Sequence, residues 1–230
     1  MLEQMRKHMN WIMWIILILV IVSFLFFGIY PSDGGRGEAA KVNGDVITAG
    51  ELDRAYRSMY ETYRQIFKDQ FTDAMSRTLR QQALRELIQN RLLVQEASRM
   101  GLRVSDDEVR AAIMQTPTFA PAGRFDKAAY ERYLDYINVK PGAFEEQQRE
   151  YMLKQKIERI IEDGVAVTDD ELKAAYAARN PKAKAGSSDK EREGFRTSYL
   201  AEKKRDALTA YVQTLYKKGK IVTNEAALTP

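Results

Sequence analysis

The residues of this chain best suited to chemistry form two short carboxylate runs, Asp106-Asp107-Glu108 and Asp169-Asp170-Glu171. Closely spaced carboxylates can bind a metal ion or act as a general acid and base. Each run, however, directly follows Ser105 or Thr168 and would occupy the first turn of a helix, where negative charge interacts favourably with the helix dipole. We therefore interpret both runs as helix starts rather than as a catalytic or metal-binding site.

The remaining inventory of reactive side chains excludes several classes of enzyme. The 230 residues include no cysteine and one histidine, His8, so disulfide scaffolds, thiolate metal sites and cysteine nucleophiles are ruled out. His8 precedes a long apolar segment, which would separate it from the rest of the chain. It therefore could not supply the histidine of a Ser-His-Asp triad beyond that segment. No phosphate-binding or dinucleotide-binding glycine motif is present, and no motif supports a serine–lysine pair. We expect no enzymatic activity, no cofactor and no metal.

The charge of the chain argues against nucleic acid as a partner. There are 36 basic and 32 acidic residues, which give a formal net charge of +4. This is a mixed surface rather than the concentrated basic field that nucleic-acid binding usually requires.

An uncharged segment at residues 11–30 predicts a membrane anchor. Fourteen of its twenty residues are Ile, Leu, Val or Phe, and about 20 helical residues span the hydrocarbon core of a bilayer. Trp11 and Tyr30 lie at its ends, and Arg6 and Lys7 precede it, which favours a cytoplasmic amino terminus. We expect a leader at 1–10, a transmembrane helix at 11–30 and a glycine-rich flexible tether at 31–38. A cleaved signal peptide is the alternative, but the run is longer than usual and no small-residue cleavage motif follows closely.

The exported part is expected to be mainly α, with a small sheet formed by strands from its two ends. Asn43-Gly44 joins strand candidates 40–42 and 46–48 as a tight hairpin, and 220–223 is the comparable strand near the other end. Capping boxes predict helix starts after Thr48, Ser105 and Thr168, and Asp126 and Pro141 predict two more. Gly101 and Gly164 predict helix ends, and a long final helix follows a linker at 181–189.

Aromatic and methionine side chains supply a candidate surface for binding apolar partners, because flexible thioethers and aromatic rings adapt to many shapes. Each candidate can instead belong to the core. The candidates are Tyr60, Tyr63, Phe67, Phe71 and Met75, placed along one long helical stretch, and Met114 and Phe119 beside a proline-containing loop.

The order of these segments resembles the SurA/PpiD family of bacterial envelope chaperones, in particular their SurA-like amino-terminal chaperone domain. The resemblance rests on Ala40–Ile47, on Leu84–Val109 and on the stretches Gly123–Asp126, Phe144–Ile160 and Val167–Tyr176. With the anchor, it is closer to the membrane-bound members. It implies one chaperone domain at 39–230, facing the periplasm from the bacterial inner membrane, with a role in envelope protein folding and outer-membrane biogenesis.

In relatives a parvulin prolyl isomerase domain follows the position that corresponds to Tyr176. Here the linker at 181–189 is too short to hold one, and the parvulin site residues have no counterparts, so the resemblance implies the chaperone half without the isomerase. The expected function is that of a membrane-tethered holdase, which binds unfolded exported polypeptides without ATP near the secretion channel. The alternative is a bitopic scaffold subunit that docks one fixed envelope or secretion-machinery partner.

Overall fold

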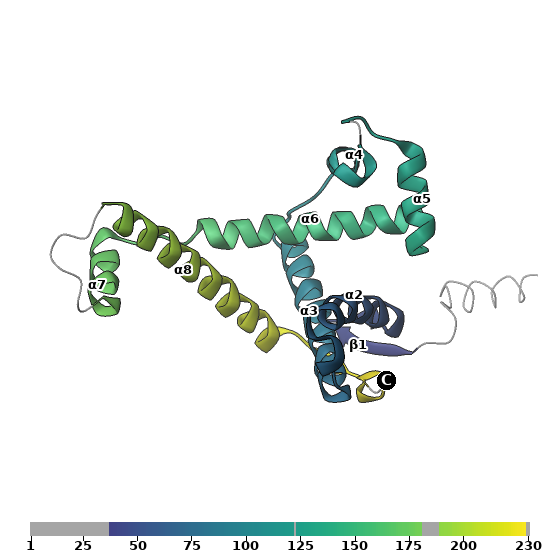
Figure 1. Ribbon diagram of the computed structural model, residues 1–230, viewed down its shortest axis with the longest axis horizontal. Helices are drawn as coiled ribbons and strands as arrows, with labels where there is room; N and C mark the ends of the chain where they lie inside the picture. Colours follow the sequence, from purple (N-terminus) through teal and green to yellow (C-terminus); the bar gives the residue numbers. More distant parts are fainter. Residues whose placement is uncertain (1–36, 122, 181–188, 229–230) are drawn as a thin grey trace, which may run out of the picture.

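The protein is mainly helical with one small antiparallel sheet (Figure 1). The computed structural model describes residues 37–121, 123–180 and 189–228. The elements in chain order are β1 (Glu38–Val42), β2 (Asp45–Thr48), α2 (Ala49–Phe67), η1 (Lys68–Gln70), α3 (Asp73–Arg99), α4 (Asp106–Gln115), η2 (Pro117–Phe119), α5 (Lys127–Ile137), α6 (Pro141–Asp163), α7 (Asp169–Arg179), α8 (Asp189–Lys218), β3 (Ile221–Thr223) and η3 (Glu225–Leu228).

The predicted membrane helix at 11–30 lies outside the described residues, as does most of the predicted tether. Within the described part of the chain, no helix is both long enough and apolar enough to cross a bilayer. β1 begins at Glu38, the last residue assigned to the tether. At the other predicted junction, residues 180–188 alone separate α7 from α8.

The sheet joins the two ends of the described chain, as the sequence predicted. Its strand order is β2-β1-β3, with β1 antiparallel to both neighbours. Asn43 and Gly44 have φ values of 53° and 101°, the positive angles that a tight hairpin turn needs. The Asn43 N–H donates to the Lys220 carbonyl at 2.9 Å, and the Lys220 N–H donates to Asn43 Oδ1 at 2.8 Å. The hairpin turn is therefore tied to the end of α8.

Helix α3 contributes to two buried clusters of apolar side chains. Its Leu84, Ile88 and Leu92 pack with the sheet and with Leu52 of α2. Its Leu93 and Ala97 pack with α4, α5, α6 and α8. Figure 1 shows α6 lying across the C-terminal end of α3, and α8 running from α7 back toward the sheet. The helix thus connects the two halves of the molecule.

Local signals fix most helix ends where the sequence placed them. Thr48 and Ser105 form complete capping boxes with Glu51 and Glu108, Asp126 caps α5, and Pro141 begins α6. α3 ends at Arg99, before Gly101 with φ 80°, and α6 ends before Gly164.

The third capping box is only half formed. Thr168 accepts from the Glu171 N–H at 3.2 Å, but the Glu171 carboxylate instead pairs with Lys203 at 2.7 Å and accepts from the Tyr199 hydroxyl at 3.0 Å. These hydrogen bonds from α8 lower the pKa of Glu171. The carboxylate that could have capped α7 therefore joins α7 to α8.

A buried carboxylate joins the end of α3 to α8. Glu96 is 9% exposed. It accepts from Arg99 Nε and Nη2 at 2.7 Å each and from the Tyr211 hydroxyl at 2.7 Å. The bidentate Arg99 interaction, opposed by burial and helped by Tyr211, lowers the pKa of Glu96 to about 2. The ionised form of Glu96 is the form that stabilises this junction.

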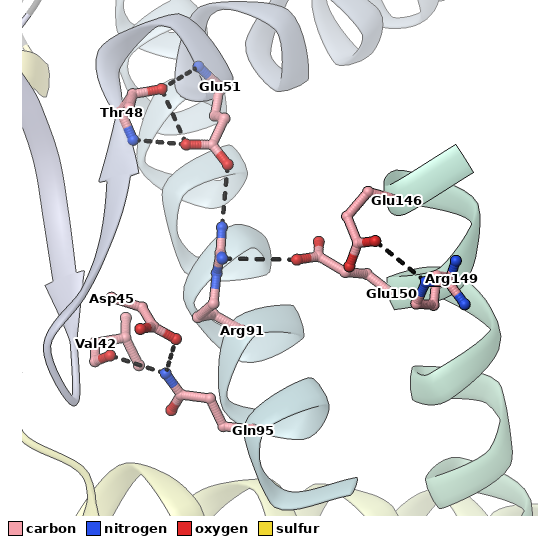
Figure 2. Close-up of polar contacts among 9 residues, drawn as sticks. All are labelled: Val42, Asp45, Thr48, Glu51, Arg91, Gln95, Glu146, Arg149 and Glu150. Atoms are coloured by element: carbon pink, nitrogen blue, oxygen red, sulfur yellow. Dashed lines mark hydrogen bonds and ion pairs between the residues drawn. The ribbon is translucent and has the colours of Figure 1, made fainter. Parts of the chain in front are cut away.

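A polar seam joins the sheet, α2, α3 and α6 (Figure 2). Arg91 of α3 contacts Glu51 of the first capping box at 3.1 Å and Glu150 of α6 at 3.6 Å. One turn further along α3, Gln95 donates to the Val42 carbonyl at 3.0 Å and to Asp45 at 2.6 Å. Burial raises the pKa of Glu150, Arg91 lowers it, and the nearby Glu146, Glu51 and Asp45 raise it further. Arg91 is thus the cation that allows several carboxylates to lie close together.

The Glu96 junction predicts a specific pH dependence of stability. Because the pKa of Glu96 is lowered on folding, its stabilising effect is complete above the unfolded-state value of 4.5 and is lost as the pH falls toward about 2. Since Arg99 is 74% exposed, solvent screens its interaction with Glu96. We therefore expect Glu96→Gln to lower the free energy of unfolding by about 1–2 kcal/mol at neutral pH. Denaturant unfolding of the full chain in detergent, followed by circular dichroism, should show wild type and variant converging near pH 2. The control is Glu131→Gln, which removes an exposed ion pair with Lys127 on α5. If the unfolding free energies of wild type and Glu96→Gln ran parallel as a function of pH, the assignment would be contradicted.

The seam predicts unequal effects for its two partners. Arg91→Met leaves carboxylates without their shared cation, and we expect a loss of about 1–2 kcal/mol in unfolding free energy at neutral pH. Glu150→Gln should change stability by less than about 0.5 kcal/mol, because ionised Glu150 is already disfavoured by burial. The double variant should be more stable than Arg91→Met. Equal losses in the two single variants, measured by denaturant unfolding, would argue against this role for Arg91.

Candidate functional site

Six apolar side chains lie where α2 ends and α3 begins. We call Tyr60, Tyr63, Ile66, Phe67, Phe71 and Met75 the aromatic tip. The Tyr60 and Phe71 rings meet edge to face across the turn, with centroids 5.0 Å apart. The Tyr63 and Phe67 rings stack along α2 at 5.9 Å. None of the six belongs to either of the two buried clusters among the described residues.

The chain reverses within this group, which corrects the expectation of a single long helix through Met75. α2 ends at Phe67, and Lys68 has a φ of 44°, which interrupts the right-handed helix. After η1, the Thr72 hydroxyl accepts from the Met75 N–H at 3.3 Å and caps α3. The aromatic residues of the predicted stretch therefore lie on α2 and in the turn that follows it, and Met75 lies on α3. The reversal brings Phe71 back against Tyr60.

The aromatic tip is accessible to solvent. Ile66 is 67% exposed and Phe67 is 36% exposed, while Tyr60, Tyr63, Phe71 and Met75 are half-buried. The candidate residues chosen from the sequence did not include Ile66. The available signal was Thr72, a helix-capping residue that placed the start of a new helix just beyond Ile66.

Polar contacts hold the two helices together next to the aromatic tip. Tyr56 and Ser76 share a hydrogen bond between their hydroxyls. Arg80 pairs with Asp53 at 2.7 Å and lies over the Tyr56 ring at 5.5 Å. These contacts connect α2 with α3 and limit how far the exposed rings can separate.

The other two predicted residues lie elsewhere. Met114 is 46% exposed and lies on α4, whereas the aromatic tip lies at the α2–α3 turn. Phe119 is 3% exposed, and its ring lies 5.2 Å from those of Tyr130 and Tyr133 and 6.0 Å from that of Phe144. The structure therefore corrects the expectation for Phe119: it fills the core between η2, α5 and α6 and is not available on the surface.

The arrangement at the tip suits apolar contact rather than covalent chemistry. The exposed edges of Tyr63, Ile66 and Phe67 can pack against apolar side chains of varied shape. In the described ranges, no group of three Asp, Glu or His side chains is placed to hold a metal ion. The tip is therefore a small aromatic surface that contacts between α2 and α3 hold in place.

Comparisons with known proteins agree with this architecture. The family model of the SurA-like N-terminal domain matches residues 1–158. The periplasmic chaperone PpiD of Escherichia coli K12 is 33% identical over 181 residues, which cover 75% of this chain and 28% of that protein. PpiD of Haemophilus influenzae is 34% identical over 126 residues, which cover 52% of this chain and 20% of that protein. The chain thus spans less than a third of the length of these relatives.

A solved structure shares the fold. A chain from work on PEB4 and Cj1289, two structurally related SurA-like chaperones of Campylobacter jejuni, superposes with a TM-score of 0.52 at 13% identity. The match covers 82% of this chain and 99% of the other. The family model matches more than half of the chain and includes strands β1 and β2, the α2–α3 hairpin and α4 to most of α6. The chain belongs to the SurA-like N-terminal domain family.

Proposed function

We propose that the protein is a membrane-tethered holdase, which binds unfolded exported polypeptides through the aromatic tip and works without ATP. The observation that carries the proposal is the accessible group of apolar side chains at the α2–α3 turn, outside both buried clusters. An apolar surface that is exposed yet held in place is typical of a binding site. The similarity to proteins named periplasmic chaperones supports the same function.

The size of the aromatic tip fits weak and reversible binding. Four of its six side chains are already half-buried, so a partner gains only the remaining apolar contact. We expect dissociation constants on the order of micromolar, or about -8 kcal/mol, with fast release. Such binding needs no nucleotide to drive release, and the sequence has no recognisable ATP-binding motif.

Tethering would compensate for weak affinity. The apolar residues 11–30 are the proposed anchor, with residues 1–10 in the cytoplasm and the chaperone domain in the periplasm. An anchored domain meets chains that leave a nearby secretion channel at a raised effective concentration. The proposed partners are therefore exported unfolded polypeptides, the lipid bilayer and the secretion channel, and the protein acts by binding alone.

Polar substitution of the aromatic tip should weaken holdase activity. Replacing Tyr63, Ile66 and Phe67 together by Ser removes exposed apolar area, and we expect about tenfold more protein to be needed to suppress aggregation. The measurement is light scattering of thermally unfolding citrate synthase, with the full chain held in nanodiscs.

The matched control replaces three exposed apolar residues elsewhere, Tyr136, Tyr151 and Ile160, by Ser. This variant should suppress aggregation as wild type does. Equal loss of activity in both variants would show that general surface apolarity, not the tip, binds clients. Crosslinking in cells that captures one stoichiometric partner in place of many clients would favour the scaffold alternative.

The proposed anchor makes a separate prediction. Leu19→Arg combined with Val22→Arg places two charges near the centre of the segment, each costing about 3 kcal/mol on insertion scales. Wild type should stay with membranes after alkaline extraction, whereas the variant should be released. Asn10→Arg, outside the segment, should behave as wild type. A shortened soluble form of the wild-type protein would instead indicate signal-peptide cleavage.

A further inference from the structure

A row of charged side chains runs beside the aromatic residues of α2. Tyr56, Tyr60, Tyr63 and Phe67 recur at helical spacing, and each is followed directly by a charged residue. These followers are Arg57, Glu61, Arg64 and Lys68, and all four are exposed. Because successive residues are turned by about 100° around a helix axis, Arg57, Glu61 and Arg64 border the aromatic row, and Lys68 follows where the helix ends. We call these four residues the basic row, since three of the four are cations.

The cations of the basic row lack carboxylate partners. Many cations elsewhere are paired, such as Arg149 with Asp106 at 2.7 Å and Arg179 with Glu202 at 2.6 Å. Within the described ranges, by contrast, Arg57, Arg64 and Lys68 form no ion pair with a carboxylate. Arg64 lies 5.9 Å from the Tyr60 ring centroid, which draws its guanidinium toward the aromatic surface. Three cations therefore border the aromatic tip without a direct ion pair to a described carboxylate.

We propose that this surface prefers unfolded segments in which acidic side chains accompany aromatic ones. The inference rests on the proposed function, since it concerns which polypeptides the aromatic tip binds. A bound segment would bury its rings against Tyr63 and Phe67 while its carboxylates accept hydrogen bonds from Arg57 and Arg64. Guanidinium–carboxylate pairs of this kind are strengthened where neighbouring rings exclude water. Segments rich in lysine would place like charges together and bind more weakly.

The test uses two short fluorescein-labelled peptides with the same aromatic residues, one with glutamates between them and one with lysines. Their dissociation constants are measured by anisotropy on the full chain in nanodiscs of neutral lipid. We expect the glutamate peptide to bind about tenfold more tightly at low salt, with the ratio falling toward about twofold near 0.5 M salt because of screening. Arg57→Glu combined with Arg64→Glu should reverse the preference.

The matched control is Arg159→Glu combined with Arg196→Glu, which reverses two exposed arginines that also form no ion pair with a described residue. It should retain the wild-type preference. Equal binding of both peptides by wild type would overturn the inference but leave the proposed function intact. The proposed function itself would fail if neither peptide bound and the Tyr63, Ile66 and Phe67 substitutions had no effect on aggregation.

Added vesicles of anionic lipid separate a membrane role from a client role. If the full chain in neutral nanodiscs bound these vesicles through Arg57 and Arg64 yet showed no preference between the peptides, the basic row would serve a lipid surface and the inference would be wrong. A peptide preference that persists with the vesicles present supports it.

Discussion

The burial of α3 along both of its halves is the constraint on which the rest of the structure depends. Leu92 packs toward the sheet while its neighbour Leu93, 0% exposed, packs toward α4, α6 and α8. Adjacent residues on a helix point about 100° apart, so one helix can face two clusters at once. A shift of α3 along its axis would disturb both clusters together, because interiors are close-packed. This couples the region that carries the aromatic tip to α6 and α8.

The polar contacts of α3 add directionality to this packing. Apolar burial has little dependence on angle, so polar groups with defined hydrogen-bond geometry help to set how the neighbouring helices are oriented. Arg91 and Gln95 fix α3 against the hairpin turn and α6, and Glu96 fixes it against α8 through Tyr211. These groups lie within two turns of one helix. The start of α2 is held through Glu51, which serves both its own helix cap and Arg91.

The sequence predicted features that depend on neighbours along the chain and missed those that depend on tertiary contacts. The Asn43-Gly44 turn, the caps at Thr48 and Ser105 and the end of α3 near Gly101 each follow from a few adjacent residues. Glu171 has the same local signal as Glu51 but is drawn to Lys203, which no pattern near Thr168 reveals. Phe119 was a candidate for the surface and for the core alike, and only the tertiary contacts with α5 and α6 show that it is a core residue. The sequence placed Tyr60, Tyr63, Phe67, Phe71 and Met75 along one helical stretch, but it did not predict the reversal that brings Tyr60 and Phe71 together.

The position of the tip explains why its apolar side chains are not absorbed into the core. Beyond Leu52 and Leu79, α2 and α3 carry no fully buried side chains toward the turn. The hairpin therefore extends past the sheet cluster, and its rings pack against one another and against Tyr56 instead of entering the core. Edge-to-face and stacked ring pairs contribute about 0.5–1.5 kcal/mol each, enough to order the rings without covering them. Extending the hairpin beyond the core therefore leaves apolar surface exposed while two packed helices still hold it in place, which is the combination that reversible binding of unfolded chains requires.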